Sequence, residues 1–158
     1  MKTVLVLLLL VLAPAAALAD TVSYAGAQLS LPDEGWRVIS EDRLLTIVDE
    51  RGGAFIEVYS FSKLPAAQAA ALATLVDGRR DTTSTRIAEV TPHAQHGLRG
   101  LRWSGRTRIR DREVALAGVA LAGVGGRVAL AIAFWRPDLD VARVAEVQAA
   151  LGSLRARR

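Results

Sequence analysis

The sequence predicts an α+β fold: an antiparallel β-sheet flanked by helices in an α/β/α sandwich. Three observations lead to this prediction. Several segments alternate apolar and polar residues and are separated by glycine-containing turns, which is typical of antiparallel strands. An alanine-rich segment with helical periodicity lies between two groups of strands, and an amphipathic helical segment follows the last strand. Strands, a helix, further strands and a final helix indicate an antiparallel sheet with helices packed on it.

Short strands are predicted in the first part of the chain. The sequence ERGG, residues 50–53, contains two glycines that can adopt positive φ, so it favours a tight turn in a β-hairpin over residues 44–62. Pro32, Asp33 and Gly35 supply turn chemistry before the hairpin. The predicted strands in this part are residues 24–31, 36–40, 44–49 and 54–62.

A helix is predicted to begin near Pro65 and to end at Gly78. Alanine is the best helix former, proline suits the first helical turn, and Gly78 is a plausible stop. The residues that share its apolar face are Ala69, Leu72, Leu75 and Val76. After it, residues 81–85 are predicted as a loop, 86–90 as a strand and 91–97 as irregular.

Three long strands and a closing helix follow. Residues 114–122 are apolar on both faces, which predicts a central strand, and residues 127–135 form the last strand. Pro137 precedes the final helix, and Asp138 or Asp140 can cap it. Its predicted apolar stripe consists of Val141, Val144, Val147, Leu151 and Leu154.

The first nineteen residues have the features of a Sec-type signal peptide. Lys2 is followed by an apolar run over residues 3–12, and Ala17-Leu18-Ala19 fits the small-x-small pattern before a cleavage site. An uncleaved anchor is the alternative, but the run is shorter than the roughly 20 apolar residues of a membrane span. We therefore expect cleavage after Ala19, a periplasmic or secreted location without stable membrane insertion, and one domain over residues 20–158.

Composition excludes several classes of function. The chain has no cysteine, which excludes thiol chemistry, iron–sulfur clusters and cysteine zinc sites. The net charge is +4, and cleavage would remove Lys2 and no acid, which leaves +3. A charge this small affects solubility and weak association more than it indicates nucleic acid as a partner.

The order of elements and two short motifs resemble a known superfamily. The motif LPDEGW at residues 31–36 is followed by a hairpin, a helix, three long strands and an amphipathic helix that ends in LGSL. Over residues 24–154 this pattern resembles the PsbP/DcrB-like superfamily. The resemblance implies an α/β/α sandwich and a mostly non-enzymatic role as accessory subunit, adaptor or chaperone, often in an exported protein. No functional residue is carried over, because the superfamily shares no catalytic set.

Arginines dominate one stretch, residues 98–114, LRGLRWSGRTRIRDREV. In its alternation Leu101, Trp103, Thr107 and Ile109 share one parity and are predicted to face inward. The outward residues include the candidate ligand-binding set Arg102, Arg106, Arg108 and Arg110, which would hold an anionic partner because the guanidinium fork binds carboxylate and phosphate. We favour the interpretation of an ordinary solvated strand face, neutralised by cross-strand acids such as Glu57, Asp111 or Glu113, and keep these arginines as the first candidate for a binding surface.

Two further candidate sites are weaker. His93 and His96 are the only histidines, and with Glu89 or Asp111 they would make a metal site; two solvated loop histidines are the alternative. A second candidate is an apolar cleft lined by the tryptophans, against which core packing is the default. These tryptophans are Trp36, Trp103 and Trp135.

We therefore expect an exported, non-catalytic binding or accessory module that acts on another protein or an anionic envelope surface, with no cofactor and no metal. Ser104 in RWSGR lacks the first glycine of a nucleophile elbow, and the paired acids lie in predicted turns, where carboxylates are solvated. Two alternatives remain open: a metal-assisted hydrolase that uses His93 and His96, and a carrier of a small apolar ligand.

Overall fold

The computed structural model describes residues 20–31, 34–41, 44–79 and 81–156 of the chain. The predicted signal peptide, residues 1–19, and part of the LPDEGW turn lie outside these residues. The elements are β1 (Thr21–Tyr24), β2 (Ala27–Ser30), β3 (Trp36–Glu41), β4 (Leu44–Asp49), β5 (Ala54–Phe61), α1 (Ala69–Asp77), β6 (Thr82–Gln95), β7 (Leu98–Ile109), β8 (Arg112–Ala122), the 3₁₀ turn η1 (Val124–Gly126), β9 (Val128–Trp135), α2 (Val141–Gly152) and β10 (Arg155–Ala156).

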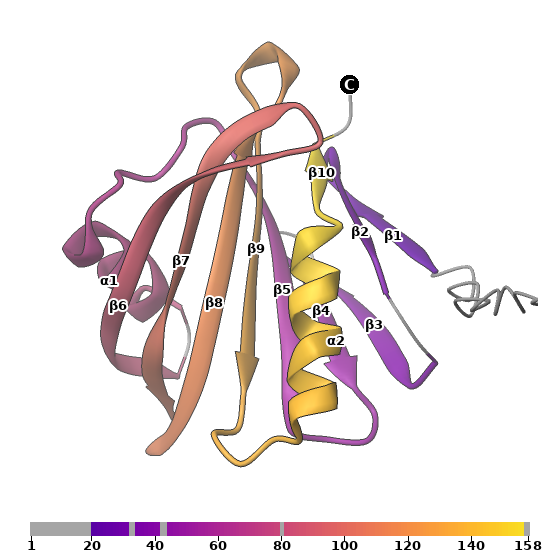
Figure 1. Cartoon of the computed structure of the whole chain (residues 1–158), viewed down its shortest axis with the longest axis vertical. Coiled ribbons are helices and arrows are strands. Elements are labelled where there is room, and N and C mark those ends of the chain that lie inside the picture. The colour runs from indigo at the N-terminus through magenta and orange to yellow at the C-terminus, as the bar shows by residue number, and fades with distance from the viewer. Residues whose placement is uncertain (1–19, 32–33, 42–43, 80, 157–158) are drawn as a thin grey trace, which may run out of the picture.

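In the described part of the chain, seven antiparallel strands form the main sheet in the order β3-β4-β5-β9-β8-β7-β6. Helix α2 lies in front of this sheet, and α1 lies on the other side, behind β6 and β7 (Figure 1). The predicted α+β class, an antiparallel sheet flanked by helices, is therefore confirmed.

A small second sheet was not foreseen from the sequence. The prediction of one strand over residues 24–31 is wrong, because Ala25 and Gly26 both adopt positive φ and turn the chain into the β1–β2 hairpin. Strand β10 then pairs with β2, with Arg155 opposite Gln28. The sheet order is β1-β2-β10. This sheet joins the two ends of the described chain, a pairing that no local pattern indicates.

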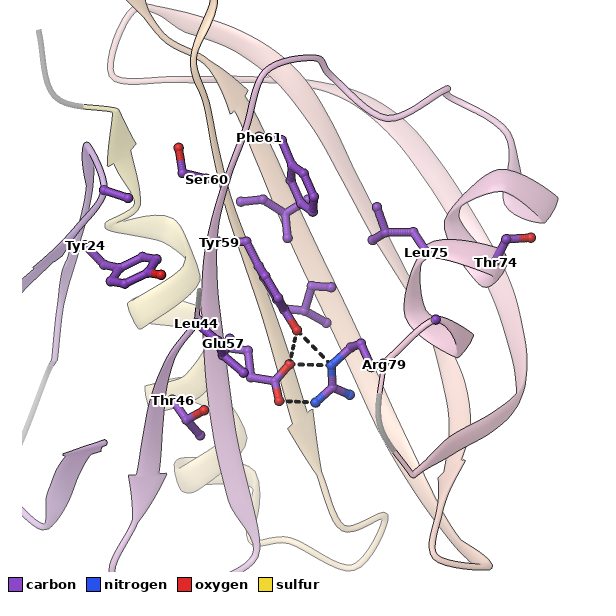
Figure 2. A pocket seen from close by; sticks show the side chains of 14 residues that line it. Tyr24, Leu44, Thr46, Glu57, Tyr59, Ser60, Phe61, Thr74, Leu75 and Arg79 are labelled. Carbon is purple, nitrogen blue, oxygen red and sulfur yellow. Dashed lines mark hydrogen bonds and ion pairs between the residues drawn. The ribbon is translucent and has the colours of Figure 1, made fainter. Parts of the chain in front are cut away.

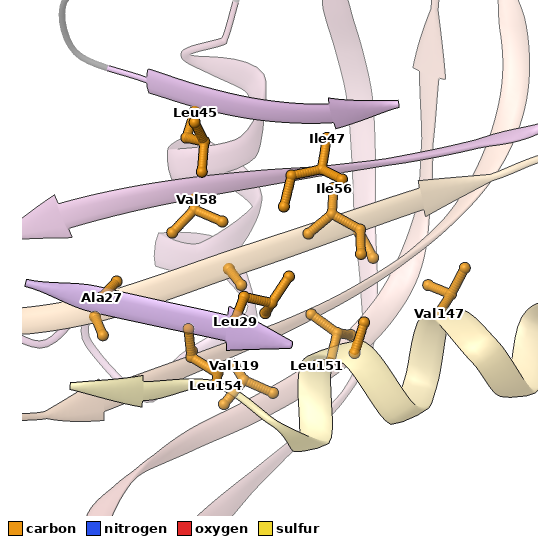
Figure 3. Close-up of a cluster of buried hydrophobic side chains, with 14 of the residues drawn as sticks. Ala27, Leu29, Leu45, Ile47, Ile56, Val58, Val119, Val147, Leu151 and Leu154 are labelled. Carbon is orange, nitrogen blue, oxygen red and sulfur yellow. The ribbon is translucent and has the colours of Figure 1, made fainter. Parts of the chain in front are cut away.

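The hydrophobic core has two halves, one on each face of the main sheet. Strand residues of one parity pack with α2 and with the small sheet; Leu29, Val147 and Leu151 belong to this half (Figure 3). Residues of the other parity pack with α1 through Leu72 and Val76. Since side chains alternate across a strand, β8 and β9 supply both halves, which confirms the prediction of residues 114–122 as a central strand.

Two predictions for the segment that forms β6 are wrong. Residues 81–85 were expected to be a loop and 91–97 irregular, but one strand runs from Thr82 to Gln95 and pairs with β7. Pro92 is tolerated because β6 is an edge strand, where no neighbour needs its missing amide hydrogen. The register shifts twice, between Thr83 and Arg86 and between Ile87 and Glu89. Pairing with β7 thus forms a strand even where the local sequence gives only weak strand signals.

The helices begin and end close to the predicted positions. Helix α1 starts at Ala69 rather than near Pro65, after a segment without helical hydrogen bonding. Helix α2 is capped by Asp140, whose Oδ1 accepts a hydrogen bond from the amide of Ala142 at 2.7 Å, as one of the two predicted caps. The predicted apolar stripe of α2 is wrong at Val141, which is 85% exposed.

No helix in the described part of the chain is both long enough and apolar enough to cross a membrane.

Candidate functional site

The predicted arginines of β7 lie where the alternation placed them, but they are not equivalent. Leu101, Trp103 and Thr107 are buried, and the neighbouring arginines Arg106 and Arg108 are exposed, so the predicted strand parity is correct. Their partners differ. Arg102 donates to Gln148 of α2 at 2.5 Å, Arg106 pairs with Glu113 at 2.9 Å, and Arg110, beyond the end of β7, pairs with Asp81 at 3.3 Å.

A further arginine from β6 joins this surface. Arg86 lies directly opposite Arg106 in the β6–β7 register, so both side chains lie on the same face of the sheet. Arg86, Arg106, Arg108 and Glu113 line a hollow of about 550 Å³. We call Arg86, Arg106 and Arg108 the arginine groove. Like charges directly opposite each other destabilise a strand pair; Glu113 already pairs with Arg106, and a further anion in this hollow would offset the charge of Arg86.

Sequence reasoning missed Arg86 and misassigned Glu57. The position of Arg86 opposite Arg106 depends on the register shift in β6, for which the sequence gives no local signal. Glu57 was expected among the acids that neutralise the β7 arginines, but it is buried on β5 and pairs with Arg79. Of the three acids proposed, Glu113 is the one that pairs with a β7 arginine within the described residues.

The histidines are engaged at the end of α2. His93 Nε2 lies 2.8 Å from Gln95 Oε1, and Gln95 Nε2 donates to the carbonyl oxygens of Leu151 and Leu154. His96 hydrogen-bonds the carbonyl oxygen of Gly152 at 3.2 Å. Among the described residues, no three His, Asp or Glu side chains gather where they could hold a metal ion. Gln95 and His96 therefore satisfy backbone carbonyl oxygens at and just beyond the C-terminal end of α2, and His93 hydrogen-bonds Gln95.

The three tryptophans do not share a cleft, and they pack against the core, which was the default expectation. Trp103 is 1% exposed and packs in the half of the core that contains α1. Trp36 and Trp135 are partly buried against the other half, which contains α2. The sheet itself separates the two groups, because strand parity sends their side chains to opposite faces.

The larger hollow is on the α1 face of the sheet, about 880 Å³ in volume, and we call it the sheet pocket. Its walls come from the β1–β2 turn, β4, β5, the end of α1 and β9 (Figure 2). The residues that line it are Tyr24, Ala25, Leu44, Thr46, Glu57, Tyr59, Ser60, Phe61, Thr74, Leu75, Gly78, Arg79, Leu130 and Ile132.

A buried ion pair forms the floor of the sheet pocket. Arg79, just beyond α1, binds both carboxylate oxygens of Glu57 and donates to the hydroxyl of Tyr59 at 2.9 Å and to that of Thr82 at 3.1 Å. The hydroxyl of Tyr59 donates to Glu57. The guanidinium carbon lies 4.2 Å from the ring centre of Phe134, a cation–π contact. Dashed lines in Figure 2 mark the bonds among Glu57, Tyr59 and Arg79.

The environment of Tyr59 shifts its titration. Burial raises the pKa of its phenol well above the ordinary value, the charge of Glu57 raises it further, and Arg79 opposes both. The unfolded chain loses this proton near pH 10, whereas the folded chain keeps it, so Tyr59 stabilises the fold less as the pH rises above about 10.

Replacement of Tyr59 by phenylalanine should remove this pH dependence. We expect the difference in free energy of unfolding between the wild type and the Tyr59→Phe variant to shrink between pH 8 and pH 10.5. Urea denaturation of both proteins at the two pH values measures it. A difference that is constant or grows with pH would contradict a raised pKa for Tyr59.

Comparison with known proteins identifies the fold. The sequence matches no family model and no curated protein. The solution structure of cyanobacterial PsbP (CyanoP) from Synechocystis sp. PCC 6803 is similar, with a TM-score of 0.63 at 12% identity, over 90% of this chain and 95% of that chain. The chain has a PsbP-like fold. The resemblance predicted from the sequence is thereby confirmed at the level of the fold.

Two other solved structures are similar to this chain. A crystal structure of a protein from Bacteroides thetaiotaomicron matches this chain with a TM-score of 0.54 at 7% identity, over 84% of this chain and 46% of that one. A protein of unknown function from Pseudomonas aeruginosa, PA94, described as a putative regulator, matches with a TM-score of 0.49 at 15% identity, over 89% of this chain and 98% of that one. Identities this low inform on the fold alone.

Proposed function

We propose that this chain is an exported binding module that engages an acidic partner protein through the arginine groove and performs no catalysis. The observation that carries the proposal is the placement of Arg86 opposite Arg106, with Arg108 beside them around one hollow. Within the described residues neither Arg86 nor Arg108 forms an ion pair. Arginine forks bind carboxylates in a bidentate manner, which suits acidic side chains of a protein.

Glu113 favours a protein partner over an anionic membrane surface. It lines the same hollow and pairs with Arg106. The carboxylate adds nothing to the attraction of a uniformly anionic surface, whereas a protein can place a basic residue beside it and so use both signs of charge. In the proposed role, the signal peptide directs the chain to the periplasm or the exterior, and the mature protein begins at Asp20. N-terminal sequencing of the exported protein tests that start, which a retained Met1 would contradict.

The test is capture of partners from envelope extract by the mature chain. Reversal of the arginine groove to glutamate should abolish capture of the specific partner. The matched control reverses three exposed arginines elsewhere and should leave capture unchanged, since its change in net charge is the same. The control residues are Arg37, Arg127 and Arg155. All variants should fold, because exposed substitutions usually change stability by less than about 0.5 kcal/mol each.

Salt and vesicles complete the test. Capture through the groove should weaken as ionic strength rises from about 0.05 to 0.5 M, because salt screens exposed charges. Equal loss of capture in the control variant would mean that net charge, not the groove, determines binding. Groove-dependent binding to phosphatidylglycerol vesicles without any captured protein would overturn the choice of partner.

A further inference from the structure

We propose that the sheet pocket is a second binding site, which takes an uncharged amphipathic small molecule with an apolar body and a hydrogen-bonding end group. The site is independent of the arginine groove, because the two lie on opposite faces of the sheet. Glu57 and Arg79 belong to the α1 face, as does Trp103 of β7, whereas Arg106 has the opposite parity.

The walls of the pocket suit the apolar body. Leu44 and Phe61 lie on the strand side and Leu75 on the helix side, and the buried Leu130 and Ile132 of β9 also line the pocket. Because α1 packs mainly along β6 and reaches β5 only at its C-terminal end, it leaves much of β4 and β5 open on this face (Figure 1). The volume of about 880 Å³ lies within the range of small-molecule sites, roughly 300 to 1,000 Å³.

The floor of the pocket determines the charge of the end group. Glu57 and Arg79 cancel each other, and their side chains are only 6% and 13% exposed. An anionic end group would compete with Glu57 for Arg79 and leave a buried carboxylate unpaired, and a cationic one would do the reverse to Arg79. Either outcome carries a large desolvation cost. A hydroxyl or carbonyl can hydrogen-bond at this floor without separating the pair.

The fluorescent probe N-phenyl-1-naphthylamine, which is uncharged and apolar, tests the site directly. We expect saturable binding of one probe molecule by the mature chain at pH 8. Competitors with the same ten-carbon chain then report the end-group preference. Because a charged group is costly to bury, 1-decanol should displace the probe at concentrations about tenfold lower than decanoate or decylammonium. Absence of saturable probe binding, or equal displacement by all three competitors, would overturn the proposal.

Two wall variants locate the probe. Leu75→Lys places a charge on the helix side of the pocket and should weaken probe binding by about tenfold or more. Ala70→Lys is the matched control, because Ala70 is an exposed residue of the same helix that does not line the pocket. If circular dichroism shows that Leu75→Lys is unfolded, Leu44→Lys on the strand side replaces it. Unchanged probe affinity in a folded wall variant would overturn the site.

The arginine-groove variant separates this proposal from the proposed function. It should bind the probe as the wild type does, because it leaves the opposite face untouched. Loss of probe binding in that variant would contradict the independence of the two sites.

Discussion

Replacement of Asp49 by alanine is expected to lower the free energy of unfolding by about 3–5 kcal/mol, the usual effect of removing one partner from a buried ion pair. The Asp49 side chain is fully buried at the end of β4. One of its carboxylate oxygens accepts from the backbone amide of Arg51 at 3.1 Å and from Arg51 Nε at 3.2 Å. The other accepts from Arg143 of α2.

The same carboxylate therefore shapes a turn and anchors a helix. Arg51 and Arg143 also reach Glu146 of α2, at 2.7 Å and 3.2 Å. Without Asp49, two guanidinium groups lose their most buried partner, and the turn between β4 and β5 loses its bond to the amide of Arg51. The first effect releases α2 from its ionic link to the hairpin, and the second loosens the turn of that hairpin.

Urea denaturation measures the effect, with Glu50→Ala as the control. Glu50 is the next residue, but its ion pair with Arg37 is long, 3.7 Å, and exposed, so its loss should cost less than about 1 kcal/mol. The Asp49→Asn variant retains an oxygen for the amide of Arg51 and should lie between the two. Similar losses for Asp49→Ala and Glu50→Ala would contradict a stabilising role for the buried network.

Replacement of Gly118 by alanine is expected to cost about 1–3 kcal/mol, the usual effect of overpacking a core. A Cβ atom at Gly118 would lie 2.1 Å from both Cε2 and Cζ2 of Trp103. The two residues are opposite each other on β8 and β7, and Trp103 is fully buried. The indole therefore occupies the space above this glycine, and only a shift of the ring or of the strands would admit a methyl group.

A double-mutant cycle distinguishes this clash from a general intolerance of side chains on β8. Trp103→Leu removes the ring atoms that the new methyl group would meet, along with an indole nitrogen that has no hydrogen-bond partner among the described residues. Gly118→Ala should therefore cost less in the Trp103→Leu background than in the wild type. Equal costs in the two backgrounds would show that the indole is not the obstacle.

Much of the sheet is predictable from the sequence because its signals are local. The alternation along β7 predicts which side chains are buried, and the glycines after Asp49 predict the β4–β5 hairpin. Asp140 caps α2 through a bond within its own first turn. In each case the residues that determine the structure lie within a few positions of one another, so composition and spacing suffice.

The candidate sites are only partly predictable, because they also depend on residues that are far apart in the sequence. Arg106 and Arg108 follow from the strand pattern, but Arg86 joins them through a register shift in β6. Glu57 and Arg79 are 22 positions apart and meet because α1 ends above β5. Nothing in the local sequence of either residue indicates the other.

By itself, then, the sequence determined the class of fold, the order of β7, β8 and β9 along the chain and the faces that their side chains take. The tertiary structure alone decided the pairing of β10 with β2, the separation of the tryptophans and the ion pair under the sheet pocket. These features depend on which strands become neighbours and on how each helix lies across the sheet. Such arrangements arise from the free energy of packing the whole chain, which no short segment contains.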